Sequence, residues 1–291
     1  MFTRRLFTTS ACLGLVSGCS ALKADTRQPQ LQNLCQKLES TAQGRLGVCI
    51  LDTQTDQQWG WREDELFMML SSFKLLASAL VLHRVDQGKE NLQRRVTYSR
   101  NSLVPWSPIT EKYADGLGMT LGELCAATIT TSDNTAANLI LDSYGGPNAL
   151  TAYARSLGDT VTRLDRNEPS LNRQSIDGLL DTTSPRAMTK TMNKLLMGNA
   201  LESSSRQQLR EWLIANTTGG KRLKAGVPNS WLVGDKTGTN ATDANDIGIL
   251  IPPQGAPLLI SVYLAESTAD NSIKDACIAE VAKWASLQIG A

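Results

Sequence analysis

Histidine is almost absent from this sequence, since His83 is the only one among 291 residues. Enzymes that activate a serine with an imidazole need a histidine beside it, and many zinc sites need imidazole ligands. The sequence therefore argues against both classes. Any acyl transfer by this chain must move its protons through lysine and carboxylate side chains.

Cysteine, aromatic residues and excess charge are also scarce. Six cysteines in a chain of this length do not form a disulfide scaffold. Aromatic residues make up 5% of the chain and the formal net charge is +1. Proteins that bind nucleic acid usually have a strongly basic face, so we expect no nucleic-acid partner. After residue 18, no stretch is apolar enough to cross a membrane.

The first 18 residues have the features of an export signal. An arginine pair, Arg4 and Arg5, precedes an apolar stretch at 6–18 that is too short to anchor the chain. Residues 3–7 resemble a twin-arginine signal, and Val16-Ser17-Gly18-Cys19 resembles a lipoprotein cleavage site. Two interpretations stay open: Cys19 is acylated after cleavage, or the signal is an ordinary secretory one. In both, we expect the mature protein in the periplasm, and in the first the lipid on Cys19 is its only contact with a membrane.

The hydrophobic pattern predicts an α/β fold built from both ends of the chain. The expected elements are helices at 31–42 and 271–287 and strands at 45–52, 57–61, 230–236, 246–251 and 258–265. Between them, 66–215 has mostly helical patterns and loops, including a helix from Ser71 to about Gln87 that Gly88 ends. We therefore predict a helical lobe, 66–215, inserted into a discontinuous α/β lobe, 31–65 and 216–291, whose antiparallel sheet is flanked by terminal helices.

The tetrad Ser71-Ser72-Phe73-Lys74 sets a candidate nucleophile three residues before a candidate base. On one helix, this spacing places both side chains on the same face. His83 lies twelve residues further on, roughly 18 Å away along a continuous helix at about 1.5 Å per residue. It cannot act as the base of Ser71. Alone, Ser-x-x-Lys is a weak motif, because both residues are common.

Two further motifs follow in order, Ser132-Asp133-Asn134 and Lys236-Thr237-Gly238. Together with Ser-x-x-Lys they are the signature of class A β-lactamases and penicillin-binding proteins. Between them, residues 163–172 closely resemble the omega-loop segment of class A β-lactamases, which penicillin-binding proteins lack. From about Leu31 to the C-terminus, the chain resembles a class A serine β-lactamase.

This resemblance implies a role for each motif. Ser71 is the expected nucleophile, and the N–H groups of Ser71 and Thr239 are the expected oxyanion hole. Lys74 is expected near Ser71, Asn134 and Glu168, and the acylation base is left open between Lys74 and Glu168. Ser132 is expected to pass a proton to the lactam nitrogen. The substrate-binding residues implied by the family are Trp106, Asn134, Asn172, Arg222, Lys236, Thr237, Gly238 and Thr239.

The omega loop, 166–181, separates turnover from permanent acylation. A carboxylate at Glu168, held by the amide of Asn172, can position and deprotonate the water that hydrolyses the acyl-enzyme. By resemblance, Arg166 and Asp181 form the ion pair at the neck of the loop, and the Glu168-Pro169 bond is cis. We interpret Asp133 as structural, because it belongs to the loop that presents Ser132 and Asn134.

Two disulfides of some family members cannot form in this chain. Cys125 matches one end of a bridge whose other end here is Ser78. The bridge of carbapenem-hydrolysing members is also missing, because Leu70 and Asn240 stand at its ends. Arg222 and Thr239, which match residues that hold the antibiotic carboxylate, do occur in those members. We expect activity on penicillins and early cephalosporins.

Other interpretations use the same motifs. A penicillin-binding DD-peptidase shares Ser-x-x-Lys and Lys-Thr-Gly but should lack the Glu168 and Asn172 pair, and a β-lactam sensor module would bind without turnover. For Trp106, the alternative to lining the cleft is simple packing beside Pro105. For Glu168, the alternative is a solvated loop acid. We expect a monomer that uses no metal and no cofactor and acts on a small-molecule β-lactam.

Overall fold

The computed structural model describes residues 26–289. The signal at 1–18 and Cys19 lie outside this range, so export and lipidation stay predictions. Within 26–289, no helix has the length and apolar character needed to cross a membrane.

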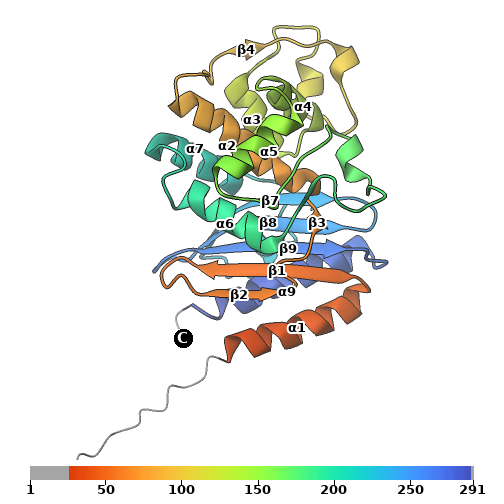
Figure 1. Ribbon diagram of the computed structural model, residues 1–291, viewed down its shortest axis with the longest axis vertical. Coiled ribbons are helices and arrows are strands. Elements are labelled where there is room, and N and C mark those ends of the chain that lie inside the picture. Colours follow the sequence, from red (N-terminus) through yellow and green to blue (C-terminus); the bar gives the residue numbers. More distant parts are fainter. Residues whose placement is uncertain (1–25, 290–291) are drawn as a thin grey trace, which may run out of the picture.

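An antiparallel sheet of five strands lies at the centre of the molecule (Figure 1). The strands are β1 (Arg45–Asp52), β2 (Gln58–Trp61), β7 (Leu232–Thr239), β8 (Ala244–Ile251) and β9 (Leu258–Ala265). Their order is β2-β1-β9-β8-β7, so both ends of the chain share one sheet, as the hydrophobic pattern predicted. The central pair, β1 and β9, aligns over eight residues, from Arg45 opposite Ala265 to Asp52 opposite Leu258.

Helices cover both faces of the sheet, because its central strands have apolar residues on both sides. On one face lie α1 (Arg27–Ala42) and α9 (Asn271–Ser286). Their apolar residues, such as Leu31 and Ile278, form one core with Leu46, Ile260 and other residues of the sheet. On the opposite face, α6 (Pro185–Leu196) packs on the sheet and joins it to the helical lobe.

The helical lobe is built around α2 (Phe73–Asp86), which is buried without interruption from Phe73 to Leu82. A helix buried on all sides is hydrophobic all round, as this one is apart from Lys74 and Ser78. Its other helices are α3 (Leu121–Thr130), α4 (Asn134–Asp142), α5 (Pro147–Ser156) and α7 (Ser203–Ile214), whereas the short α8 (Leu223–Gly226) packs against α9 in the α/β lobe. Two-residue strands pair as β3 (Phe67–Met68) with β6 (Thr182–Thr183) and β4 (Arg95–Val96) with β5 (Met119–Thr120).

The predicted helix from Ser71 begins differently in the structure. A 3₁₀ turn, η1 (Leu70–Ser72), precedes α2, because Ser72 donates both its N–H (3.1 Å) and its hydroxyl (2.7 Å) to the carbonyl oxygen of Met69. Leu70 has a φ of 48°, a left-handed conformation that costs energy for a leucine. The strained residue lies directly before Ser71, which the tight turn holds at the front of α2.

Strand β7 is longer than the sequence predicted and lies at the edge of the sheet. It runs to Thr239 instead of Lys236, because Thr239 still pairs with Ala244 of β8. An edge strand has one side without a strand partner. On that side, β7 faces η1, so the Lys236-Thr237-Gly238 motif borders the turn that carries Ser71.

Candidate active site

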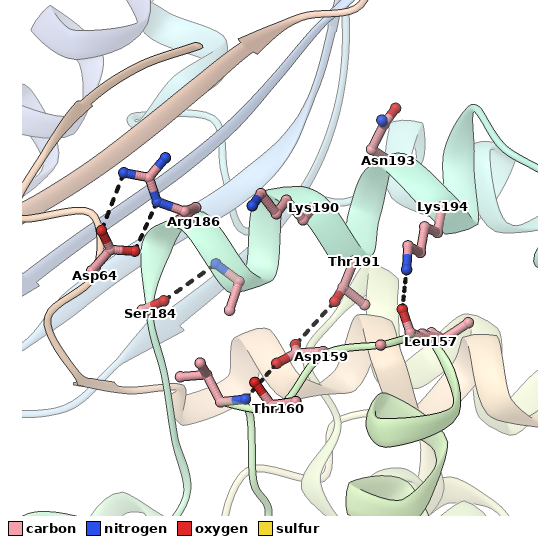
Figure 2. Close-up of a pocket in the computed structure, with 13 residues that line it drawn as sticks. Asp64, Leu157, Asp159, Thr160, Ser184, Arg186, Lys190, Thr191, Asn193 and Lys194 are labelled. Carbon is pink, nitrogen blue, oxygen red and sulfur yellow. Dashed lines mark hydrogen bonds and ion pairs between the residues drawn. The ribbon is translucent and has the colours of Figure 1, made fainter. Parts of the chain in front are cut away.

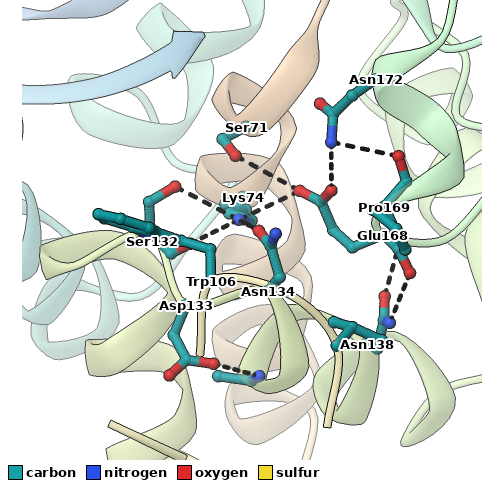
Figure 3. Close-up of polar contacts among 12 residues, drawn as sticks. Ser71, Lys74, Trp106, Ser132, Asp133, Asn134, Asn138, Glu168, Pro169 and Asn172 are labelled. Carbon is teal, nitrogen blue, oxygen red and sulfur yellow. Dashed lines mark hydrogen bonds and ion pairs between the residues drawn. The ribbon is translucent and has the colours of Figure 1, made fainter. Parts of the chain in front are cut away.

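Ser71 lies in η1, Lys74 lies in the first turn of α2, and Lys74 is fully buried. The Lys74 ammonium contacts Asn134 Oδ1 at 2.5 Å, the Ser132 carbonyl oxygen at 2.8 Å and Glu168 Oε1 at 3.1 Å (Figure 3). The Ser71 hydroxyl donates to Glu168 Oε1 at 3.4 Å. The serine and the lysine therefore meet at one carboxylate oxygen, and the hydroxyl does not bond to the lysine directly.

The loop before α4 places Ser132 and Asn134 beside Lys74. Asp133 caps α4 by accepting from the N–H of Ala136 at 2.8 Å, and it also accepts from the N–H groups of Ile109 and Thr110. It is completely buried, which agrees with its interpretation as a structural residue. With the cap in place, Ser132 has a φ of 59°, which is uncommon for a serine.

Glu168 is held in the omega loop from several sides. Arg166 and Asp181 form the predicted ion pair at 2.5 Å, and the Glu168-Pro169 bond is cis as expected. Asn172 donates to Glu168 Oε2 at 2.6 Å, so the side chain is buried and is not a solvated loop acid. The two oxygens of the Glu168 carboxylate have different partners: Oε1 contacts Ser71 and Lys74, and Oε2 contacts Asn172.

Sequence reasoning missed Asn138, which fixes the backbone of Glu168. Its amide donates to the Glu168 carbonyl at 2.9 Å and accepts from the Glu168 N–H at 3.0 Å (Figure 3). A signal was available, since Asn138 lies four residues after Asn134, on the same face of α4. The omega loop is thus attached to the helix that begins at the Ser-Asp-Asn motif.

The end of β7 completes the site opposite Glu168. Lys236 is fully buried and its ammonium donates to Ser132 Oγ at 3.2 Å, so this hydroxyl lies between two lysines. At Gly238, an added Cβ would lie 2.9 Å from Leu70 Cβ and 3.2 Å from the Ser71 nitrogen. Glycine is needed here because β7 passes against η1, in addition to the expected room for a ligand.

A cavity of about 570 Å³ lies at this site, and Lys74, Glu168 and Lys236 lie behind its lining. Its lining is Ser71, Trp106, Ser132, Asn134, Asn172, Thr218, Thr237, Gly238, Thr239 and Asn271. Trp106 is 65% exposed and donates its indole N–H to the Thr131 carbonyl, so it forms a wall of the cavity and is not simple packing. Thr218 and Asn271 were not predicted, because they carry no motif and reach the cavity only through the fold.

The family-model match and the relatives agree with this geometry. The model described as "Beta-lactamase enzyme family" matches residues 28–287. Over 281 residues, the chain is 42% identical to β-lactamase OXY-2 of Klebsiella oxytoca, covering 96% of both chains. The chain belongs to the class A β-lactamase family. It is 45% identical over 251 residues, or 86% of this chain and 85% of the other, to the carbapenem-hydrolysing β-lactamase KPC of Klebsiella oxytoca.

Solved structures of class A β-lactamases have the same fold. An ancestral class A β-lactamase (GNCA) superposes with a TM-score of 0.87 at 53% identity, over 89% of this chain and all of that one. The class A β-lactamase of the last common ancestor of Gram-negative bacteria (GNCA4) superposes with a TM-score of 0.87 at 55% identity, over 89% of this chain and 98% of that one. The protein is therefore a β-lactamase, a hydrolase with the α/β fold and helical lobe that the sequence predicted.

Arg222 lies behind Thr239 in this β-lactamase, outside the lining of the cavity. It is buried, and it donates to Asp275 Oδ1 at 2.7 Å, the Asn245 carbonyl at 2.7 Å and the Gly238 carbonyl at 3.0 Å. Its remaining contact is Thr239 Oγ1 at 2.8 Å. The guanidinium is thus occupied by the chain's own groups, and of the two expected carboxylate-binding side chains only Thr239 lines the cavity.

The pKa values of both active-site lysines are lower than usual. Burial lowers the pKa of Lys74, and the carboxylate of Glu168 opposes that shift. Burial, and next the nearby Lys74 ammonium, lower the pKa of Lys236 to about 7. A buried lysine whose pKa is lowered releases its proton more readily than a lysine in water, which suits general acid–base catalysis.

A second cavity of about 300 Å³ lies away from this site, between α6 and the loop after α5 (Figure 2). Lys190 and Lys194 border it, and Arg186 is paired there with Asp64 at 2.7 Å. Ser71 is not part of its lining, so this cavity has no place in the acyl-transfer chemistry. Within 26–289, no cluster of three metal-binding side chains is found.

Proposed function

We propose that the enzyme hydrolyses penicillins and early cephalosporins through an acyl-enzyme on Ser71, and that it confers resistance to them. The observation that carries the proposal is the position of Glu168. Its Oε1 lies 3.4 Å from the nucleophile and 3.1 Å from Lys74, and its Oε2 is held by Asn172. A protein that binds β-lactams without turnover does not need a carboxylate beside the nucleophile to activate water.

In the acylation step, Ser71 Oγ attacks the lactam carbonyl carbon, and the carbonyl oxygen takes the negative charge. The N–H groups of Ser71 and Thr239 stabilise it, a contribution of about 10²-fold or more for each donor. The hydroxyl proton leaves toward Glu168 Oε1 or toward Lys74. Both groups stay candidates for the acylation base, because Ser71 and Lys74 contact the same oxygen, Glu168 Oε1. The carbonyl then re-forms and the lactam C–N bond breaks. Ser132 delivers its proton to the leaving nitrogen and regains one from the lysine ammonium groups, since its hydroxyl contacts both Lys74 and Lys236.

In the deacylation step, a water is held between Glu168 and Asn172 on the open side of the acyl group. Glu168 deprotonates it and the ester is hydrolysed. Thr237, Thr239 and the ammonium of Lys236 bind the substrate carboxylate. Arg222 acts indirectly, because it orients the Thr239 hydroxyl to which it donates. The relative named for carbapenem hydrolysis is 45% identical to this chain. Leu70 and Asn240 stand at the two positions that the bridge of carbapenem-hydrolysing members would join, so carbapenems are not among the proposed substrates.

The test is steady-state turnover of a chromogenic cephalosporin by the purified protein. Multiple turnovers should occur, and Ser71→Ala should abolish both turnover and covalent labelling. Ser99→Ala, which changes an exposed serine of the helical lobe, is the matched control and should behave as the parent. A single stoichiometric burst without turnover would instead indicate the penicillin-binding or sensor alternative.

We also propose that the enzyme is exported by residues 1–18 and works as a periplasmic monomer. Cell fractionation with a Cys19→Ala variant separates the two signal interpretations. Retention of the parent in membranes, lost in the variant, would indicate a lipid on Cys19.

A further inference from the structure

Two aspartates lie side by side beneath the active site, on the strands β7 and β8. Asp235 is 1% exposed and Asp246 is fully buried. Asp246 stands opposite Thr237 in the strand register, so Asp235 is its diagonal neighbour on the same face of the sheet. Buried carboxylates are normally paired with a cation. Within residues 26–289, neither of these two takes part in an ion pair closer than 4.0 Å.

The hydrogen bonds of the two carboxyl groups leave one oxygen without a donor. Asp235 Oδ2 accepts from the amide of Asn216 at 2.6 Å, and Asp246 Oδ2 accepts from the N–H of Leu223 at 3.1 Å. Asp246 Oδ1 is buried and receives no donor. The group within its reach is the carboxyl of Asp235. Two carboxylates cannot bond to each other, because both are acceptors, but a carboxylic acid can donate to a carboxylate.

We propose that Asp235 and Asp246 share one proton in the folded enzyme, and that this acid–carboxylate pair positions Lys236 and Thr237 for catalysis. The pair satisfies the orphan oxygen of Asp246 and joins β7 to β8 below the cavity. It also holds the segment 216–223 against β7, because each carboxyl accepts from a residue of that segment. The role of Lys236 in this proposal rests on the proposed function.

A chain of hydrogen bonds connects the pair to the cavity. Asn216, which donates to Asp235, accepts from the Thr218 hydroxyl at 2.8 Å. The Thr218 hydroxyl in turn contacts the Thr237 hydroxyl at 2.5 Å. Thr218 and Thr237 both line the cavity. Loss of the shared proton would therefore change the position of a side chain that contacts substrate.

The charged groups around the pair are consistent with a single negative charge. Burial raises the pKa of Asp235, and burial followed by the charge of Asp235 raises the pKa of Asp246. The cations that face them are Lys236 on β7 and Arg222 and Lys224 on the adjoining segment. The carboxylate of Asp275 on α9 already neutralises Arg222. One retained negative charge supports the ammonium of Lys236, whereas two would repel each other in a buried site.

The proton makes stability depend on pH with a defined sign. Above the ordinary pKa of an aspartic acid, roughly 4, the unfolded chain releases this proton and the folded enzyme keeps it. Folding then takes up one proton, so the stabilisation is full at low pH and is lost as the pH rises toward the raised pKa of the pair. In that window the unfolding constant should rise up to about tenfold per pH unit through this pair alone.

The test compares Asp246→Asn with Asp246→Ala in the full enzyme. The asparagine amide can donate to Asp235 without a titrating proton and leaves one negative charge in place. Urea unfolding between pH 5 and 7 gives the number of protons taken up on folding from the pH dependence of the free energy of unfolding. This number should be lower in Asp246→Asn than in the parent, by up to one proton. The control is Asp159→Asn, a buried aspartate that accepts from the N–H groups of Val161 and Thr162 and from the hydroxyls of Thr162 and Thr191. It should not reduce proton uptake.

Carboxyl ¹³C NMR on aspartate-labelled enzyme observes the proton directly. At pH 6, the parent should have one protonated aspartate that both Asp246→Asn and Asp235→Asn remove. Both aspartates ionised at pH 6, with unchanged linkage in Asp246→Asn, would overturn the shared proton. These measurements need no substrate, so they stay valid if β-lactam turnover fails.

The positioning role has its own readout in the activity of folded variants. Asp246→Asn should keep kcat/KM for a cephalosporin within about threefold at pH 6–7, and Asp246→Ala should lower it at least tenfold. If Asp246→Ala kept the parental value, or if asparagine failed to rescue it, the pair would not position the site.

Discussion

Replacement of Glu168 by alanine separates the two halves of the reaction. The substitution removes the carboxylate that Asn172 holds at 2.6 Å and that lies 3.1 Å from Lys74. Ser71, Ser132 and the backbone donors of the oxyanion hole remain. Lys74 keeps two acceptors, Asn134 Oδ1 at 2.5 Å and the Ser132 carbonyl at 2.8 Å. Ring opening should therefore continue, at a lower rate, while deacylation loses its base.

The size of the effect follows from these contacts. A positioned general base contributes about 10²–10⁴-fold, or about 2.7–5.5 kcal/mol of barrier at 25 °C. Removing one partner of a buried ion pair costs about 3–5 kcal/mol of folding stability. We expect the lower end of that range, because burial already lowers the pKa of Lys74 and loss of Glu168 lets its ammonium release the proton. The variant should fold.

The assay is mass spectrometry of Glu168→Ala after mixing with a penicillin. The protein should become heavier by one whole antibiotic molecule, carried on the peptide that contains Ser71, and the adduct should persist while the parent shows none. Asp177→Ala removes a solvent-exposed carboxylate from the same loop and is the matched control. Turnover by Glu168→Ala at the parental rate, without an adduct, would refute the assignment of Glu168 as the deacylation base.

Three further outcomes are expected. Arg222→Ala should lower kcat/KM on penicillins by an amount that corresponds to about 1.5–3 kcal/mol of transition-state stabilisation, because the Thr239 hydroxyl loses its charged partner. Values of kcat/KM within twofold of the parent would show that Arg222 has no role in catalysis. Gly238→Ala should reduce the free energy of unfolding by about 1–3 kcal/mol in urea titrations, because the new Cβ overlaps Leu70, and an unchanged midpoint would contradict this close packing. The free thiol of Cys125, whose pKa burial raises to about 12, should react only after denaturation, and peptide mapping that finds it in a disulfide would contradict the prediction.

The strands of the sheet show how far local pattern predicts the fold. β9 has the predicted bounds, Leu258–Ala265, and β1 begins and ends as expected, because each is an apolar run between turn-forming residues. The predicted bounds were less accurate for β7 and for the start of the helix that η1 precedes. Their ends depend on pairing with β8 and on the bonds of Ser72 to Met69, and such contacts are not encoded in the local pattern.

The sequence by itself determined the parts of the site that depend on short spacing: Ser71 before Lys74, Asn172 after Glu168, and Asp133 as a structural residue between Ser132 and Asn134. Helices and tight loops convert spacings of three and four residues into contacts without help from the rest of the chain. Only the tertiary structure decided the rest. It brought Thr218 and Asn271 to the cavity, turned Arg222 toward Thr239 and set Asp235 against Asp246. These contacts follow from strand register and lobe packing, in which residues far apart in the chain meet through long-range burial that no local motif records.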